Sequence, residues 1–223
     1  MELSDYVRML RQRGWIMVVV AAVAAISAFG FSKLQHPIYK SSMQMTVLPA
    51  RNDMGLAQTT KQLLRAYVTI IDTKKFAANV LQRFEQAGTP LDMTPEQLKD
   101  NAIIASFEDK NVIQIDVKNG DGELGNRIAI AWAQEFRDWR EQENNKVRKE
   151  DRVDVVLGDN PIYTQFLPQT KINTAAGGIL GLLLGALVVA ALEWVESGVV
   201  RTTADVERKL GLPVLGVIPN AEK

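Results

Sequence analysis

Two long uncharged runs constrain the fold of this chain more than any other feature. The first, Trp15–Phe31, reads WIMVVVAAVAAISAFGF, and the second, Ala175–Leu192, reads AAGGILGLLLGALVVAAL. A helix rises about 1.5 Å per residue, so such runs cover roughly 26–30 Å, about the thickness of the hydrocarbon core of a bilayer. The first run follows arginines as a signal peptide would, but its apolar part is long and no small-residue cleavage site closes it. We expect two uncleaved transmembrane helices.

Basic residues flank both runs on their outer sides. They are Arg8, Arg11 and Arg13 before the first run and Arg201, Arg208, Lys209 and Lys223 after the second. Because basic short flanks stay in the cytoplasm, we expect both termini on the cytoplasmic side of the plasma (inner) membrane. The predicted division is a cytoplasmic N-terminus at 1–14, a transmembrane helix at 15–32, an extracytoplasmic α+β domain at 33–171, a transmembrane helix at 172–194 and a cytoplasmic tail at 195–223.

Composition removes several classes of function. Lysine plus arginine and aspartate plus glutamate both number 26, so no overall positive charge favours binding to nucleic acid. The chain has no cysteine and one histidine, which leaves no thiolate ligand, thiol nucleophile or histidine cluster for a metal. We expect no metal and no cofactor.

Apolar periodicity between the two runs predicts a mixed domain. Alternation in 43–47 indicates a strand, and stripes at helical spacing in 63–71 and 76–84 indicate two helices. Thr94-Pro95-Glu96-Gln97 has the capping residue, proline and glutamine of a helix start. Two β-rich runs, 102–107 and 111–117, predict a hairpin.

A long helix and a last strand follow the turn Asn119-Gly120-Asp121-Gly122. Its apolar stripe comprises Leu124, Ile128, Trp132, Phe136 and Trp139. The stretch 140–152 is almost wholly charged and polar, and we expect it to protrude into solvent or meet a neighbouring subunit. A short strand at 153–157 completes the order β-α-α-α-β-β-α-β, with the first and last strands paired.

The second apolar run carries three glycines at four-residue spacing, Gly177, Gly181 and Gly185. Glycine is common in membrane helices, but glycines in register form a ridge that another helix can approach at backbone distance. Small residues on the first run, at 21, 24, 25 and 28, offer a milder surface of the same kind. We expect a helix–helix interface at the ridge that serves packing and oligomerisation.

Few residues suggest catalysis. Asp121 and Glu123 resemble the paired acids of a metal-dependent glycosyltransferase, but acids at a helix N-terminus are also favoured by the helix dipole. His36 could be a ligand or a solvated linker residue. Trp132 and Trp139 could stack on sugar rings or pack in the core or at a subunit interface. We favour the structural interpretation each time and assign no catalytic residue.

Charged residues near the end of the long helix leave two interpretations open. The basic ones are Arg137, Arg140, Arg148, Lys149 and Arg152, and the interspersed acidic ones are Asp138, Glu141, Glu143, Glu150 and Asp151. The basic residues suit an anionic polysaccharide, whereas the mixture of signs favours a solvated or intersubunit salt-bridged face, which we prefer.

Several segments in order resemble the Wzz-type polysaccharide chain-length determinant family, over essentially the whole chain. The residues are MELSDYVRMLRQRGW before the first run, Pro37-Ile38-Tyr39-Lys40 after it, Pro168-Gln169-Thr170-Lys171 before the second run, and Asp205-Val206-Glu207 with Leu210–Pro219, which includes Leu212 and Pro213, after it. The lack of a long coiled-coil extension places the resemblance in the compact capsule-type branch, and the chain has fewer prolines before the second run than the family often has.

The resemblance implies a non-enzymatic polysaccharide co-polymerase. Such a protein forms a membrane homo-oligomer, binds polysaccharide or its lipid-linked intermediate, and sets the chain length of O-antigen, capsule or exopolysaccharide made by a Wzy-type polymerase. Fused family members continue after Pro219 into a tyrosine-kinase domain, but this chain has no phosphate loop and no tyrosine after Tyr163, so we expect no autokinase activity. The alternative is an adaptor whose tail activates a separate tyrosine kinase, and a more distant one is a two-span sensor.

Overall fold

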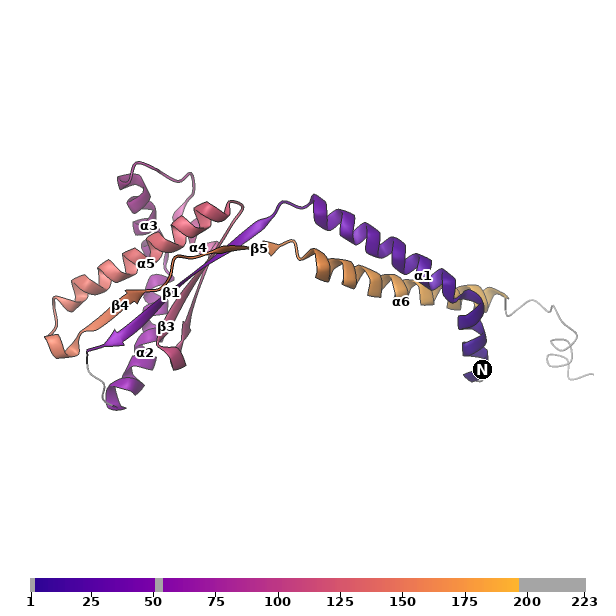
Figure 1. Cartoon of the computed structure of the whole chain (residues 1–223), viewed down its shortest axis with the longest axis horizontal. Coiled ribbons are helices and arrows are strands. Elements are labelled where there is room, and N and C mark those ends of the chain that lie inside the picture. Colours follow the sequence, from indigo (N-terminus) through magenta and orange to yellow (C-terminus); the bar gives the residue numbers. More distant parts are fainter. Residues whose placement is uncertain (1–2, 51–53, 197–223) are drawn as a thin grey trace, which may run out of the picture. The chain divides into compact units, whose positions relative to one another are not determined.

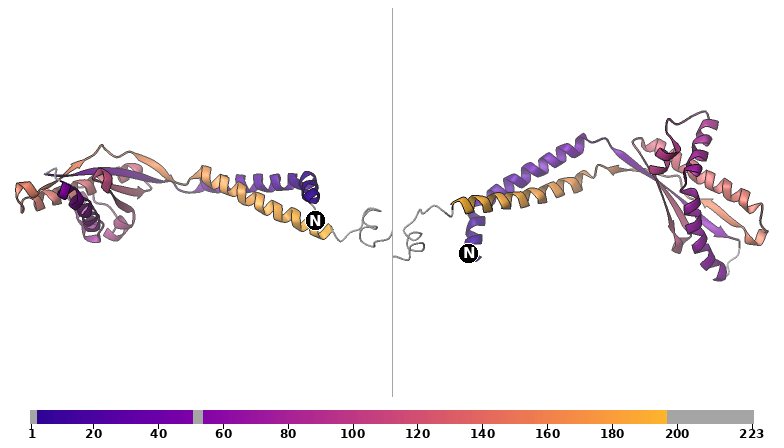
Figure 2. Two further views of the ribbon diagram at one scale, coloured as in Figure 1. Left: turned by 90° about the horizontal axis from the view of Figure 1, so that it is seen from below. Right: turned by 180° about the vertical axis from the view of Figure 1, so that it is seen from behind.

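The computed structural model describes residues 3–50 and 54–196. The chain divides into two units, a helix pair outside residues 35–169 and a domain at Gln35–Gln169. The helix pair consists of α1 (Leu3–Leu34) and α6 (Thr170–Glu196), which lie side by side (Figure 1, Figure 2). The domain consists of β1 (Ile38–Pro49), α2 (Met54–Ile71), α3 (Lys74–Gln86), α4 (Pro95–Asp100), β2 (Ala102–Phe107), β3 (Val112–Asn119), α5 (Gly122–Asn144), β4 (Val153–Leu157) and β5 (Tyr163–Leu167), with 3₁₀ turns at Glu108–Lys110 and Lys149–Asp151.

The long strand β1 organises the sheet. It pairs antiparallel with β3 along one edge, where Met43 lies opposite Ile115. Its other edge is shared by β4, in register Val47↔Val155, and by β5, in register Ser41↔Tyr163. With β2 beside β3, the order is β2-β3-β1-β4, and β5 pairs with β1 outside this path. The predicted hairpin and the predicted pairing of the first strand with 153–157 are confirmed.

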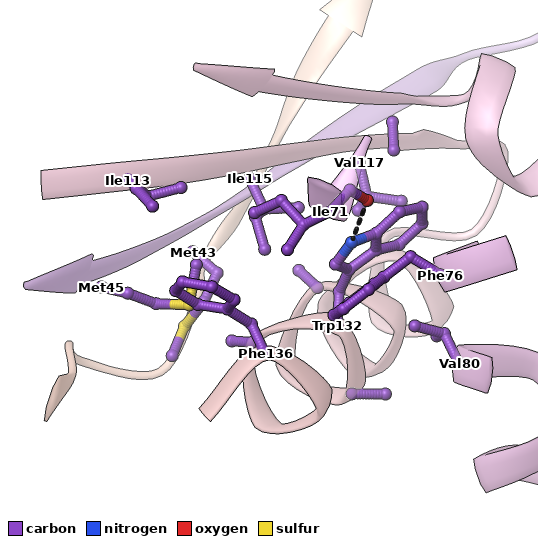
Figure 3. Packing of buried hydrophobic residues seen from close by; sticks show 14 of the residues in the cluster. Met43, Met45, Ile71, Phe76, Val80, Ile113, Ile115, Val117, Trp132 and Phe136 are labelled. Carbon is purple, nitrogen blue, oxygen red and sulfur yellow. Dashed lines mark hydrogen bonds between the residues drawn. The ribbon is translucent and has the colours of Figure 1, made fainter. Parts of the chain in front are cut away.

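One face of the sheet is covered by helices and forms the core (Figure 2). Alternate residues of β1 and β3 are buried on that face: Met43, Met45, Val47, Ile113, Ile115 and Val117. Figure 3 shows Phe136 of α5 beside the two methionines and Trp132 stacked on Phe76 of α3. The Trp132 indole Nε1 donates to the Ile71 carbonyl oxygen at 3.3 Å, so this buried polar group has a partner.

Threonine side chains cap two helices, and the cap at Thr94 lies where the sequence predicts a helix to begin. Thr94 accepts a hydrogen bond from the Gln97 backbone N–H while the Gln97 side chain accepts from the Thr94 N–H, which completes a capping box at α4. Thr73 caps α3 in the same position by accepting from the Phe76 N–H at 3.2 Å.

One expectation about the domain holds in part, and one strand was missed. Residues 145–151 of the charged stretch are exposed as expected, but α5 ends at Asn144 and both Arg140 and Asn144 are buried. Contact of this stretch with a neighbouring subunit stays a prediction. Strand β5 was not predicted, because its residues are nearly all exposed and carry no apolar alternation. Its position is set by backbone pairing with β1 instead.

Candidate functional site

The helix pair has the dimensions and surface of membrane spans. Its apolar segments are Arg11–Leu34 and Thr170–Val195, of 24 and 26 residues, enough for roughly 36–39 Å of helix. The most apolar part of the first segment has no buried residues, and 17% of the most apolar part of the second segment is buried. Side chains such as Ile26, Phe31 and Leu187 are therefore exposed, as side chains that face lipid are in a structure without a membrane.

The glycine ridge of α6 lies against α1 of the same chain. A Cβ atom added to Gly181 would lie 2.7 Å from the Ala21 Cα atom, and one added to Gly185 would lie 2.7 Å from the Met17 Cα atom. At Gly177 it would lie 2.6 Å from the Ala28 Cβ atom. Side chains cannot be accommodated at such distances, so the three glycines allow the two helices to touch at backbone distance. Their part in oligomerisation stays a prediction.

Polar contacts join the two helices near both ends of the pair. Ser32, which is buried, donates to the Thr170 hydroxyl at 3.2 Å and accepts from the Asn173 side-chain amide at 3.2 Å. Toward the other end, the Arg13 guanidinium and the Glu193 carboxylate are 3.9 Å apart. Hydrogen bonds between membrane helices contribute on average about 0.6 kcal/mol each, so these contacts align the pair while the ridge supplies the close packing.

The family-motif residues before and after the spans lie at the chain connections. Pro37 follows α1, and Pro168 follows β5 through a cis peptide bond. Tyr39 in β1 meets Tyr163 in β5 edge to face, with ring centroids 5.4 Å apart. Lys171 is exposed in the first turn of α6. The remaining motif residues, Leu212, Pro213 and Pro219, lie outside the described residues.

The acids at the start of α5 have a structural role. The Asp121 carboxylate accepts from the Glu123 N–H at 2.9 Å and from the Leu124 N–H at 3.3 Å, which makes it the N-cap of the helix. Glu123 lies in the first turn, where the helix dipole favours a negative charge. His36 is exposed between α1 and β1. Within the described ranges, no three histidine, aspartate or glutamate side chains come together as a metal site would require.

The two tryptophans of α5 belong to the packing of the domain. Trp132 has no exposed surface, which leaves no face for a sugar ring and confirms its place in the core. Trp139 is partly exposed, stacks on Phe136 with centroids 5.9 Å apart, and meets the Tyr67 ring edge to face. Burial raises the pKa of Tyr67, and the nearby Arg140 charge opposes that effect.

A three-residue ion pair links α3 to α5. The Arg83 guanidinium donates to Glu135 at 2.8 Å and to Asp138 at 2.7 Å. Burial alone would lower the pKa of Arg83, but hydrogen bonds and charge from the two carboxylates raise it. Burial alone would raise the pKa of Asp138, but hydrogen bonds from Arg83 and Arg137 lower it.

The basic residues near the end of α5 fall into two groups. Arg137 pairs with Asp138 and Arg148 with Asp151, both at 3.1 Å, as expected for a solvated salt-bridged face. Arg140 is instead only 9% exposed and lies over the rings of Tyr67 and Trp139, with its Cζ atom 5.0 and 5.5 Å from the two centroids.

Asn144 connects Arg140 to strand β4. It accepts from the Arg140 Nη2 atom at 2.9 Å and from the Val153 N–H at 3.1 Å, and it donates to the Val153 carbonyl and the Asp154 carboxylate. The signal for this buried pair was present in the sequence. Ile128, Trp132, Phe136, Arg140 and Asn144 recur every four residues and share one helix face.

Comparison with known proteins agrees with this architecture. The family model described as Wzz, Chain length determinant protein, matches residues 1–84, a segment that ends within the last turn of α3. The resemblance to that family is thereby confirmed, and the two apolar helices make the chain a two-pass membrane protein with an α+β domain between its spans.

Several capsular polysaccharide biosynthesis proteins are similar over most of their length. The probable capsular polysaccharide biosynthesis protein YwqC of Bacillus subtilis (strain 168) is 26% identical over 212 residues, which cover 91% of this chain and 80% of that protein. The capsular polysaccharide type 5 biosynthesis protein cap5A of Staphylococcus aureus (strain Newman) is 23% identical over 98% of this chain and 96% of that protein. The capsular polysaccharide biosynthesis protein CpsC of Streptococcus pneumoniae is 23% identical over 97% of this chain and 93% of that protein. These similarities agree with the capsule-type branch, and none of the three names states an enzymatic activity.

Proposed function

We propose that this chain is a non-enzymatic polysaccharide co-polymerase that sets the chain length of a surface polysaccharide. The observation that carries the proposal is the match of residues 1–84 to the Wzz family model, in a chain that has two membrane helices and whose similar proteins are named for capsular polysaccharide biosynthesis. The chain would act on a Wzy-type polymerase as a homo-oligomer, and the polysaccharide or its lipid-linked intermediate would be the molecule that it holds.

The proposal includes a topology with both termini cytoplasmic and the domain outside. Its support is the basic residues of the two short flanks. A reporter fused at Asn160, in the exposed connection between β4 and β5, is expected to report an extracytoplasmic position. A reporter that is active only in the cytoplasm and becomes active at Asn160 would contradict the topology.

If the chain catalyses no reaction, the length of the polysaccharide must be set by the geometry of the assembly. An oligomer would keep the polymerase and its growing product engaged for a limited time, and that time would define the length distribution. The candidates for catalysis support this interpretation, because Asp121 caps a helix, Glu123 complements its dipole and His36 lies exposed in a connection. Any of these three could then be replaced with little change in polysaccharide length.

The decisive experiment is gel analysis of polysaccharide from a deletion strain. Deletion is expected to replace the normal length distribution with a broader or displaced one, and the full chain should restore it. Asp121→Ala and His36→Ala variants should restore it as well. Restoration by the full chain but complete failure of a folded, oligomeric Asp121→Ala variant would indicate an enzyme instead.

The second candidate is an adaptor that activates a separate tyrosine kinase. It is favoured by the tail 199–223, whose Leu210–Pro219 segment resembles the part of the family that precedes a fused kinase domain and lies outside the described residues. Removal of residues after 198 separates the two candidates. Loss of kinase phosphorylation with an unchanged length distribution favours the adaptor, and a changed distribution in a strain without any such kinase favours the co-polymerase.

A further inference from the structure

One apolar side chain of the domain is far more exposed than the others. Ile162, in the connection between β4 and β5 (Figure 1), is 81% exposed, whereas no other large apolar side chain described in the domain exceeds 50%. Its neighbours are fixed, because Pro161 is buried and Tyr163 begins β5 and pairs with Ser41 of β1. An apolar side chain on such a rigid segment loses little conformational entropy when it is buried by a partner.

An open pocket of about 220 Å³ lies between α3 and α5, and we call it the α3–α5 pocket. Most of its surface is apolar and comes from Phe84, Ala87, Ile130 and Ala131, with Arg127 beside them. Engineered apolar cavities of about 150 Å³ bind a molecule as large as benzene, so the α3–α5 pocket has room for one branched apolar side chain.

Arg127 gives this pocket an uncompensated positive charge. Its Nη2 atom donates to the Thr89 hydroxyl at 3.0 Å, and its Cζ atom lies 5.5 Å from the centroid of the Phe84 ring. None of the ion pairs formed by the described residues includes Arg127. Arg83, the other arginine at the pocket, is already paired with two carboxylates of α5. An acidic group that approaches the pocket would therefore be attracted to Arg127.

The segment that carries Ile162 has the complementary charge. Asp159 lies three residues earlier, is exposed, and takes part in no ion pair with any residue that the structure describes. Three residues span at most about 10 Å, so the carboxylate stays close to the isoleucine. An apolar side chain with an acidic neighbour matches an apolar pocket with a basic neighbour, and opposite charges of this kind fix the orientation in which two surfaces meet.

Both surfaces lie at the same level of β1. Ser41 of that strand is opposite Tyr163, the residue after Ile162. On the helix side, a Cβ atom added to Gly125, two residues before Arg127, would lie 2.8 Å from the Ser41 Oγ atom. A second copy that is displaced sideways can therefore bring its isoleucine to the pocket without sliding along the strand.

We propose that Ile162 of one copy of this chain enters the α3–α5 pocket of the next copy, with Asp159 of the first copy facing Arg127 of the second. Because the two surfaces differ, the contact is heterologous and repeats from copy to copy, which builds a ring when the rotation closes. The inference rests on the proposed function, from which it takes the homo-oligomer, and it assigns the residues at which the copies meet.

Disulfide cross-linking in the membrane tests this contact. The chain has no cysteine, so Ile162→Cys and Ala87→Cys in one full-length chain supply the only thiols. Oxidation should produce a ladder of dimers, trimers and larger species on a non-reducing gel, because each copy is linked to two neighbours. Each substitution alone should give no ladder.

The matched control pairs Val156→Cys with Ala87→Cys. Val156 is an exposed apolar residue of β4 that lies outside the connection containing Ile162. Its yield of species larger than a dimer should be at most about one tenth of that of the Ile162→Cys pair.

Exchange of the two charges tests the orientation. In the chain with cysteines at 162 and 87, Arg127→Glu should reduce the yield of the ladder severalfold, and addition of Asp159→Arg should restore it because the charges attract again. Asp159→Arg alone, at an exposed position, should reduce the yield as well and keeps the test available if Arg127→Glu does not fold.

Three outcomes would overturn the proposal. The first is the absence of cross-linked species, and the second is a product that stops at dimers, as a head-to-head contact would give. The third is a ladder of equal yield from the Val156→Cys pair or one that is insensitive to both charge changes. None of these outcomes alters the restoration of polysaccharide length by the wild-type chain in the deletion strain, so failure of this contact and failure of the proposed function are distinguished.

Discussion

Adding a single methyl group to the glycine ridge should separate the membrane helices. In a Gly181→Ala variant the new Cβ atom would lie 2.7 Å from the Ala21 Cα atom and 2.7 Å from the Ala24 Cβ atom. Carbon atoms pack at about 3.5–4.0 Å, so the helices must move apart by roughly 1 Å at this level. Because one obstacle is backbone, no side-chain rotation relieves the overlap. Overpacking of this kind costs about 1–3 kcal/mol.

The neighbouring glycine provides a matched control. A Cβ atom on Gly178 would lie 3.8 Å from the Ala25 Cβ atom, which is an ordinary van der Waals contact. Gly178→Ala therefore makes the same chemical change on the same helix without overlap. We expect its stability to remain within about 0.5 kcal/mol of that of the wild-type chain.

Distance measurement between spin labels tests the separation directly. The chain has no cysteine, so labels can be introduced through Val23→Cys and Leu183→Cys, which replace exposed side chains on the two helices. Dilution with unlabelled protein restricts the signal to pairs within one chain. Gly181→Ala should lengthen the mean distance and lower the melting temperature in detergent by roughly 2–12 °C. Equal distances and melting temperatures in the Gly181→Ala and Gly178→Ala variants would refute the backbone contact at this level.

Three further predictions concern the domain. Asp121→Ala should lower the free energy of unfolding by about 1 kcal/mol through loss of the N-cap, measured by urea titration, while polysaccharide length is retained. The folded-state pKa of Asp138 lies below its ordinary value, so its ionised form stabilises the domain above about pH 4, and that contribution is lost as pH falls through the folded-state pKa. Arg83→Gln should therefore destabilise the domain by about 1 kcal/mol near neutral pH and by less in acid, and an equal effect in both would contradict the ion pair. Trp132→Phe should cost about 1–3 kcal/mol in the same titration because the Ile71 carbonyl oxygen loses its indole donor in the core, and an unchanged midpoint would show that this hydrogen bond contributes nothing.

The sequence predicted those elements whose signal is local. The hairpin of β2 and β3 and the capping box at Thr94 depend on residues a few positions apart, and alternation or capping identifies them without knowledge of the rest of the fold. Strand β5 has no such signal. It is an exposed edge segment that pairs with β1, more than a hundred residues earlier in the chain.

Arg140 shows the same limit at the level of a single residue. Its charge suggested a solvated position, whereas its four-residue spacing from Phe136 and Asn144 places it on the buried face of α5. Whether such an arginine is buried or solvated depends on partners from α2 and β4, here the Tyr67 ring and, through Asn144, Asp154. Folding alone brings those partners together.

The sequence by itself determined the two apolar helices, the mixed domain between them and the residues able to lie at backbone distance in a membrane, because length, charge and glycine spacing act without tertiary context. Only the tertiary structure decided which surface each glycine meets and that Arg140 lies against the Tyr67 and Trp139 rings and Asn144. Those contacts join α6 to α1 and α5 to α2, and the free energy of such a contact depends on atoms from both segments.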